Sequence, residues 1–115
     1  MPNLTIALTL LCVLCISLGQ ILFKKAAAAL TEPMTLQAVV FNGWLIASLA
    51  LYGLTTLGWV WILRHAPLHL AYPFMGLAFL IVPTLAWLFL GEPLRWRTLA
   101  GGGLIMAGVA LASTN

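Results

Sequence analysis

Long apolar spans, separated by short polar connections, divide the chain into four segments. The first is free of charged residues from Leu4 to Phe23, and at about 1.5 Å per residue it can cross a hydrocarbon core about 30 Å thick. The pattern predicts four transmembrane helices over residues 4–30, 37–63, 69–91 and 95–113, within a single domain, 1–115. The predicted fold class is therefore an all-α integral membrane protein.

The third span contains two prolines, Pro73 and Pro83. Pro83 lies deep in the apolar run and cannot donate a hydrogen bond to the carbonyl of Phe79, so the sequence predicts a bend or hinge there. A membrane helix broken by proline is tolerated where protein or a water-filled cavity satisfies the freed carbonyl groups. With Tyr72 on the same face as Pro83, this helix is expected to line a cavity.

Polar side chains recur along one face of the first span. Ser17, Gln20 and Lys24 are spaced i, i+3 and i+7, which places them on one helix face, and we expect that face to point inward. Lys25 lies about 100° further round the helix, where it can extend to the lipid headgroups. An alternative is that both lysines only anchor the end of the helix.

The second span carries a polar and aromatic stripe. Ser48, Tyr52, Thr55 and Trp59 follow one another at spacings of four, three and four. Two interpretations stay open for this stripe. It contacts a substrate, or it provides ordinary hydrogen bonds between helices together with a tryptophan at the membrane interface.

Small residues form a stripe along the last span. Ala100, Gly103, Ala107 and Ala110 are spaced i, i+3, i+7 and i+10. Small side chains let helix backbones approach closely in a membrane. We therefore expect this helix to provide a packing or dimerisation surface and no chemistry.

Composition and charge strengthen the membrane interpretation. The chain is 63% hydrophobic and 6% charged, whereas soluble domains are about 45–50% apolar and about 25% charged. Its net charge is +3, but the basic residues are scattered between apolar spans and form no basic patch, which argues against nucleic-acid binding.

Lys24, Lys25, Arg95 and Arg97 lie on one side of the predicted membrane and Arg64 on the other. The positive-inside rule then places the first and third connections in the cytoplasm and both termini in the periplasm.

Enzyme chemistry finds little support in the sequence. Cys12 and Cys15 form a C-x-x-C inside an apolar run, where buried small side chains are a better explanation than a metal or redox site. His65 and His69 are spaced i, i+4 without a nearby acid, and no pairing of a nucleophile with a base is visible. We expect no metal, no cofactor and no catalytic residue.

Several short motifs resemble a known transporter family. The pattern A-P-x-x-x-A-Y-P at Ala66–Pro73, the G-E-P at Gly91–Pro93 and the glycine-rich last helix are similar to the small multidrug resistance proteins and the wider drug/metabolite transporter superfamily. The subgroup that the chain most resembles is the subunits that flip undecaprenyl phosphate-linked aminoarabinose for lipid A modification. The residues that carry this likeness are Gly19-Gln20, Lys24, Ala71-Tyr72-Pro73 and Glu92-Pro93.

The resemblance implies a four-helix protein of the bacterial inner membrane that works as a dimer, with itself or with a similar small subunit. It implies a path lined by the first three helices, with the fourth at the subunit contact. Multidrug members carry a glutamate midway along the first helix, and pairing by the downstream glycine and lysine puts that position at Ile16 here. Because a membrane-embedded carboxylate is what holds a cation and exchanges it for a proton, proton-coupled drug export loses its main support.

A lipid phosphate carrying an amino sugar fits the remaining polar residues. Lys24, Arg64 or Arg95 can meet the phosphate, an arginine through two parallel donors. Glu92 can pair with the amino group of the sugar or, alternatively, with Arg95 three residues later. The predicted substrate-binding residues are Gln20, Lys24, Tyr72, Glu92, Arg64, Arg95, Ser17 and Tyr52, and the predicted hinge or packing residues are Pro73, Pro83, Gly103 and Ala107.

The resemblance and these residues together leave three functions open. The first is a flippase subunit that moves an undecaprenyl phosphate-linked sugar across the inner membrane, with membrane lipids and a second subunit as partners. The second is a small proton-coupled exporter of polyamines or organic cations, which would need Glu92 or Glu32 for coupling. The third is an assembly subunit without transport of its own.

Overall fold

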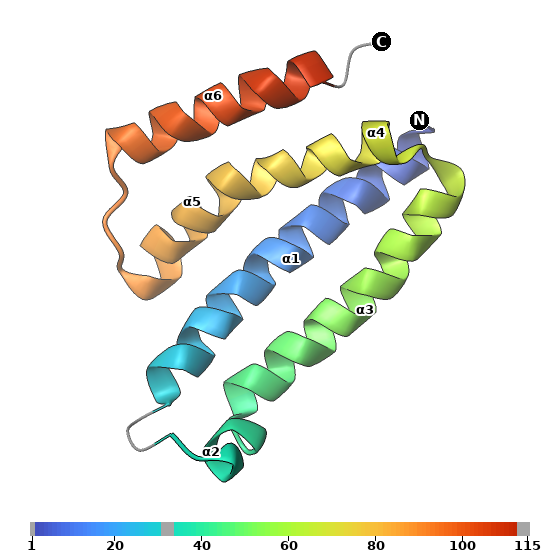
Figure 1. Ribbon diagram of the computed structural model, residues 1–115. Coiled ribbons are helices and arrows are strands. Elements are labelled where there is room, and N and C mark those ends of the chain that lie inside the picture. The colour runs from blue at the N-terminus through green and yellow to red at the C-terminus, as the bar shows by residue number, and fades with distance from the viewer. Residues whose placement is uncertain (1, 31–33, 113–115) are drawn as a thin grey trace.

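A computed structural model describes residues 2–30 and 34–112, and every regular element in these ranges is a helix (Figure 1). Glu32, which the cation-exporter hypothesis names as a possible coupling residue, lies outside the described residues. The elements are α1 (Asn3–Ala29), α2 (Leu36–Val40), α3 (Gly43–His65), α4 (Leu68–Ala71), the 3-10 helix η1 (Tyr72–Leu77), α5 (Ala78–Leu90) and α6 (Trp96–Ala112).

The length and composition of these helices match a membrane environment. Asn3–Ala29, Gly43–His65 and the continuous helical run Leu68–Leu90 are each long and apolar enough to span a bilayer, and α6 is a shorter apolar helix. Large apolar side chains are exposed along all of them, as expected for surfaces that face lipid. The structure confirms the predicted fold class, a small all-α membrane protein with four apolar helices.

The second predicted helix is divided by Asn42. The Asn42 Oδ1 accepts hydrogen bonds from the backbone N–H groups of Trp44 (3.1 Å) and Leu45 (3.3 Å), which caps the start of α3. Its Nδ2 donates to the carbonyl oxygen of Ala26 at 2.8 Å. One buried side chain therefore both begins α3 and ties it to the last turns of α1.

The irregular part of the third span lies around Pro73. Residues Tyr72–Leu77 form a 3-10 helix with Pro73 in its first turn, whereas α5 runs through Pro83 without interruption. The sequence predicted a bend or hinge at Pro83; the structure places the 3-10 geometry around the earlier proline and keeps α-helical geometry at Pro83. A 3-10 stretch within a helical run often marks a hinge, and hinge motion at either proline stays a prediction.

The packing of α1 against α3 uses small residues at seven-residue intervals. This spacing keeps one seam of each helix facing the other, as in a coiled coil, and small side chains bring the two backbones close. At one point a Cβ on Gly58 would lie 3.3 Å from the Cys12 Sγ. The buried seam residues are Thr5, Cys12, Gly19 and Ala26 on α1, and Ser48, Thr55 and Ile62 on α3.

A different pair of glycines holds α6 against η1 and α5. A Cβ on Gly76 would collide with the Val109 side chain, and one on Gly102 would collide with Leu80. The residues of the small stripe predicted on this helix, including Gly103 and Ala107, are exposed instead. Within the described chain they make no packing surface, so their role at a subunit contact stays a prediction.

The helices form an open row. In Figure 1 the order across the molecule is α6, α5, α1 and α3, with the extensive contacts between neighbours in that row. The two outer helices of the row, α3 and α6, make no extensive contact with each other. An open row does not surround a central path with the residues described.

Candidate functional site

The charged predicted site residues and Tyr72 fall at two ends of the molecule, whereas Ser17, Gln20 and Tyr52 lie between these ends. We call the first the lysine end: it comprises the last turns of α1 with Lys24 and Lys25, the start of α3, the connection 91–95 and the first turn of α6 (Figure 1). The second is the tyrosine end, residues 64–77, with Arg64 and Tyr72. The 23 residues of α3 separate the two ends by about 35 Å. The sequence analysis treated these residues as one set, and the structure separates the charged members between the two ends.

At the lysine end, Lys25 is the lysine that lines a cavity. Its Nζ lies 4.8 Å from the centre of the Trp44 ring, within the range of a cation–π interaction, and its side chain is half-buried, whereas Lys24 is exposed. The cavity has a volume of about 340 Å³ and is otherwise apolar. Its lining residues are Leu18, Ile21, Leu22, Lys25, Trp44, Leu51 and Phe89. Spacing along the sequence favoured Lys24 for the substrate and did not reveal this arrangement.

The face of α1 that carries Ser17, Gln20 and Lys24 is buried at Ser17 and exposed at the other two residues. Ser17 is fully buried, and its hydroxyl donates to the carbonyl oxygen of Val13 at 2.8 Å. Gln20 and Lys24 are exposed. The expected inward orientation is therefore wrong for these two within a single chain, and Ser17 has no free hydroxyl proton to offer a substrate.

The stripe on α3 is not a set of hydrogen bonds between helices. The Ser48 and Thr55 hydroxyls donate to carbonyl oxygens of their own helix, Trp44 and Leu51, each at 2.7 Å. Tyr52 differs because its ring lies against α1, 6.1 Å from the Phe23 ring. Tyr52 therefore lies beside the part of α1 where Gln20 is exposed.

Glu92 and Arg95 lie in the connection between α5 and α6, which is not helical. Gly91 has φ +69°, a left-handed conformation that suits glycine at a helix end, and the Glu92 N–H donates to the Ala86 carbonyl oxygen at 3.3 Å. Residues 91–95 are not helical, and both side chains are exposed. The local Glu92–Arg95 pair that the sequence left open is not formed in the described chain, because it relied on helical i, i+3 spacing.

The tyrosine end contains a wider cavity of about 700 Å³. His69 and Tyr72 line it, and Tyr72 is 63% exposed. His65 does not contribute: its Nδ1 hydrogen-bonds the Trp61 carbonyl oxygen at 2.9 Å, and its ring lies 4.2 Å from the Trp61 ring. The remaining lining residues are Trp59, Leu68 and Pro73. Arg64 is exposed beside this region.

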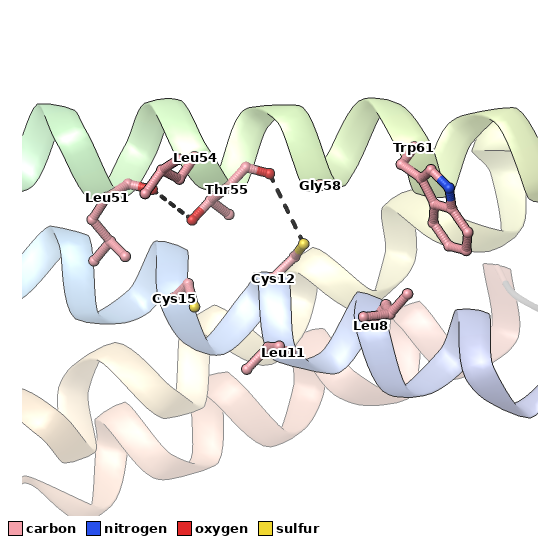
Figure 2. Close-up of a pocket in the computed structure, with 9 residues that line it drawn as sticks. All are labelled: Leu8, Leu11, Cys12, Cys15, Leu51, Leu54, Thr55, Gly58 and Trp61. Carbon is pink, nitrogen blue, oxygen red and sulfur yellow. Dashed lines mark hydrogen bonds between the residues drawn. The ribbon is translucent and has the colours of Figure 1, made fainter.

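The two cysteines lie in a third cavity, between α1 and α3. It has a volume of about 360 Å³ and apolar walls, with side chains from both helices facing one another (Figure 2). Both thiols are free, and the Cys12 Sγ lies 3.9 Å from the Thr55 carbonyl oxygen. No cluster of three potential metal ligands occurs in residues 2–30 and 34–112.

The helices and cavities define a class, the small multi-pass membrane proteins built from four apolar helices. Comparison with known proteins gives the family. The chain is 33% identical over 105 residues, 90% of this chain and 91% of the relative, to the probable 4-amino-4-deoxy-L-arabinose-phosphoundecaprenol flippase subunit ArnE of Aeromonas salmonicida (strain A449). It is 38% identical over 98 residues, 84% of each chain, to the protein of the same name from Serratia proteamaculans (strain 568).

The chain therefore belongs to the ArnE family of flippase subunits, and the resemblance found in its sequence is confirmed. No family model matches the chain, and no solved structure gives a significant match.

Proposed function

We propose that this chain is a subunit of a bacterial inner-membrane flippase that moves an undecaprenyl phosphate-linked aminosugar, such as aminoarabinose, for modification of lipid A or another envelope glycan. The observation that carries the proposal is the pair of polar ends on an otherwise apolar row. One end presents Lys25 beside Trp44, and the other presents Tyr72 and His69 around a wide cavity. Relatives named as probable flippase subunits for a phosphoundecaprenol-linked sugar support it.

The polar groups suit such a cargo. A phosphate is an anion that lysine and arginine bind through charge-assisted hydrogen bonds, and Lys24, Lys25 and Arg95 lie toward the lysine end while Arg64 serves the other. Between them, Gln20 and Tyr52 offer hydrogen bonds to sugar hydroxyls. Glu92, without a local partner in the described chain, can pair with the amino group. No covalent chemistry is involved in this mechanism.

A second subunit completes the path in our proposal. The row of helices is open and does not surround a headgroup, and the exposed Gln20 face needs a covering that a partner would supply. The relatives are named as subunits, which agrees with pairing, either with another copy or with a similar small protein. The open side of the row leaves the lipid tail in the membrane while the headgroup crosses.

The direction of insertion follows from the charges. Lys24, Lys25, Arg95 and Arg97 belong to the lysine end, which the positive-inside rule places in the cytoplasm. Both termini then face the periplasm. In this orientation the headgroup is received at the lysine end and released at the tyrosine end, by alternating access of the kind that transporters with midplane sites use.

Reconstitution tests the function. Purified protein is placed in vesicles with a fluorescent undecaprenyl phosphate-linked aminosugar, alone and together with the candidate second subunit, and reduction of the dye from outside reports the fraction exposed. We expect flipping of the sugar lipid and none of a labelled polyamine. Polyamine uptake driven by a proton gradient would favour the cation exporter. Sugar-lipid flipping by the second subunit that does not change when this chain is left out would favour an assembly role.

A further inference from the structure

We propose that a groove along α1 and α3 binds the hydrocarbon tail of a polyprenyl phosphate, with the phosphate held at Lys25. The inference rests on the proposed function and deepens it, because it assigns the lipid part of the substrate to a surface distinct from the Gln20 face. Two of the cavities described above combine to form this groove. Their continuity, their combined length and the position of a single cation support the assignment.

The two cavities are one elongated surface. The cavity around Cys15 and the cavity around Lys25 share Leu51 as a lining residue. On α3, Trp44, Leu51 and Gly58 follow at intervals of seven, and on α1 the spacing alternates between three and four, so each set keeps one face toward the groove. The α1 residues of this series are Leu8, Leu11, Cys15, Leu18, Leu22 and Lys25.

The length of the groove matches a membrane-embedded chain. Leu8 and Lys25 are separated by a rise of about 25 Å along a helix, close to the hydrocarbon thickness of about 30 Å. Its lining is almost entirely apolar, and the Thr55 hydroxyl is already bonded to Leu51 at 2.7 Å. A hydrocarbon chain lying in the groove would therefore not deprive the Thr55 hydroxyl of its partner.

The charge stands at one end of the groove. Among the residues that the structure describes, the Lys25 ammonium contacts the Trp44 ring and has no carboxylate partner. A half-buried cation in apolar surroundings is costly unless an anion compensates it, and a phosphate at this position would do so through charge-assisted hydrogen bonds. The groove thus combines one anion site with one long apolar channel.

This combination fits a single-tailed phosphate lipid better than the other candidates. A diacyl phospholipid brings two chains, whereas the cavity around Cys15 is lined by α1 and α3 alone and Phe89 of α5 narrows the groove at its Lys25 end. A second copy of this chain would bring a face with the same cation, and the sequence holds only two acids, Glu32 and Glu92. We therefore commit to a polyprenyl phosphate as the occupant.

Binding of undecaprenyl phosphate without any sugar tests the charge. Native mass spectrometry or a fluorescence competition assay in detergent gives the affinity for wild type, Lys25→Gln and Lys25→Arg. We expect Lys25→Gln to weaken binding about tenfold and Lys25→Arg to retain it. The control is Arg97→Gln, which also removes a cation beside a tryptophan, Trp96, at the lysine end (5.6 Å) but lines no part of the groove. An equal loss in both glutamine variants overturns the site.

A bulky substitution that fills the groove tests whether the groove binds the hydrocarbon tail. Leu54 and Leu57 are both 69% exposed on α3, but only Leu54 lines the groove. We expect Leu54→Trp to weaken binding of undecaprenyl phosphate about tenfold while leaving a short-chain prenyl phosphate within about twofold, and Leu57→Trp to change neither. Displacement of the probe by phosphatidylglycerol at equal concentration overturns the choice of lipid. Loss of the dimer instead of the lipid in Leu54→Trp assigns the groove to a second copy.

The binding measurements separate this inference from the proposed function. Tail binding that depends on Lys25 and Leu54, in a protein that does not flip the sugar lipid, would support the groove and reject the flippase. Flipping that is insensitive to both variants would support the flippase and reject the groove. Thermal unfolding in the same detergent identifies any variant that has lost its fold, and Lys25→Arg and Leu57→Trp keep both tests interpretable in that case.

Discussion

The lysine end and the tyrosine end of the molecule are built in opposite ways. At the lysine end, Asn42 caps α3 and also bonds α1 at 2.8 Å, and Lys25 lies over Trp44. At the tyrosine end the backbone changes to a 3-10 helix around Pro73 beside a cavity of about 700 Å³. The difference suggests that the lysine end is held in one conformation and binds a charged group, whereas the tyrosine end can change conformation.

The largest effect is expected where the tyrosine end meets α6. Gly76→Ala places a Cβ against Val109, and because a valine in a helix has one strongly preferred rotamer, it cannot turn away. We expect a loss of about 1–3 kcal/mol in the free energy of unfolding. Gly53→Ala on α3, which has nothing within 4 Å of the new Cβ, should instead stabilise the protein slightly.

Denaturation followed by circular dichroism in detergent measures both alanine variants. The double variant Gly76→Ala with Val109→Ala should regain part of the lost stability, because the two residues are coupled by contact. Equal destabilisation by Gly76→Ala and Gly53→Ala would show that α6 is not held by this close approach.

At the lysine end, Asn42→Ala should cost about 2 kcal/mol, since it removes a helix cap and leaves the Ala26 carbonyl without its partner. Asn42→Ser keeps a capping oxygen but is too short to reach α1, so its loss should be smaller and should report the link between helices. The matched control is Thr35→Ala, which removes the exposed cap of the five-residue helix α2. A loss in Thr35→Ala as large as that in Asn42→Ala would contradict the idea of a lysine end held in one conformation.

The comparison of the ends also shows which features a sequence can predict. The apolar spans and their lengths were sufficient to predict the four helices, because a helix that crosses a bilayer must be apolar over about 20 residues. The seam of Thr5, Cys12, Gly19 and Ala26 was present in the sequence as a seven-residue repeat, but it competed with the more visible stripe on α6. Residue type alone did not show that α6 approaches its neighbours through Gly102 rather than Gly103.

The choice between the two lysines depended on packing that no local pattern contains. Lys24 shares a helix face with Ser17 and Gln20, and this made it the better candidate on spacing. Lys25 lines a cavity because Asn42 brings the start of α3, with Trp44, beside the end of α1. That contact joins residues on different helices, and the irregular connection at Asn42 sets it. Helical spacing within α1 therefore could not show which of the two lysines lines a cavity.

A smaller effect is expected from the Tyr72 hydroxyl. If the released headgroup bonds to it, Tyr72→Phe removes one hydrogen bond of about 1 kcal/mol, which corresponds to about a fivefold fall in the rate of sugar-lipid flipping. The ring remains, so the cavity at the tyrosine end keeps its shape. Trp87→Phe changes another exposed aromatic residue, on α5, that lines none of the described cavities at that end, and it should leave the rate unchanged. Equal rates in wild type and Tyr72→Phe would remove the hydroxyl from the path.

The smallest change is expected at Ser17, where the polar face of α1 closes between the two ends. Its hydroxyl is fully buried and bonded to Val13 at 2.8 Å, and such bonds to the preceding turn add little to helix stability. Ser17→Ala should therefore keep the flipping rate within about twofold of wild type, whereas Gln20→Ala, one turn further and exposed, should lower it about fivefold through the loss of a bond to the sugar. The same vesicle assay measures both. A Ser17→Ala rate as low as that of Gln20→Ala would mean that Ser17 becomes exposed during transport, so that the path extends along α1 beyond the lysine end.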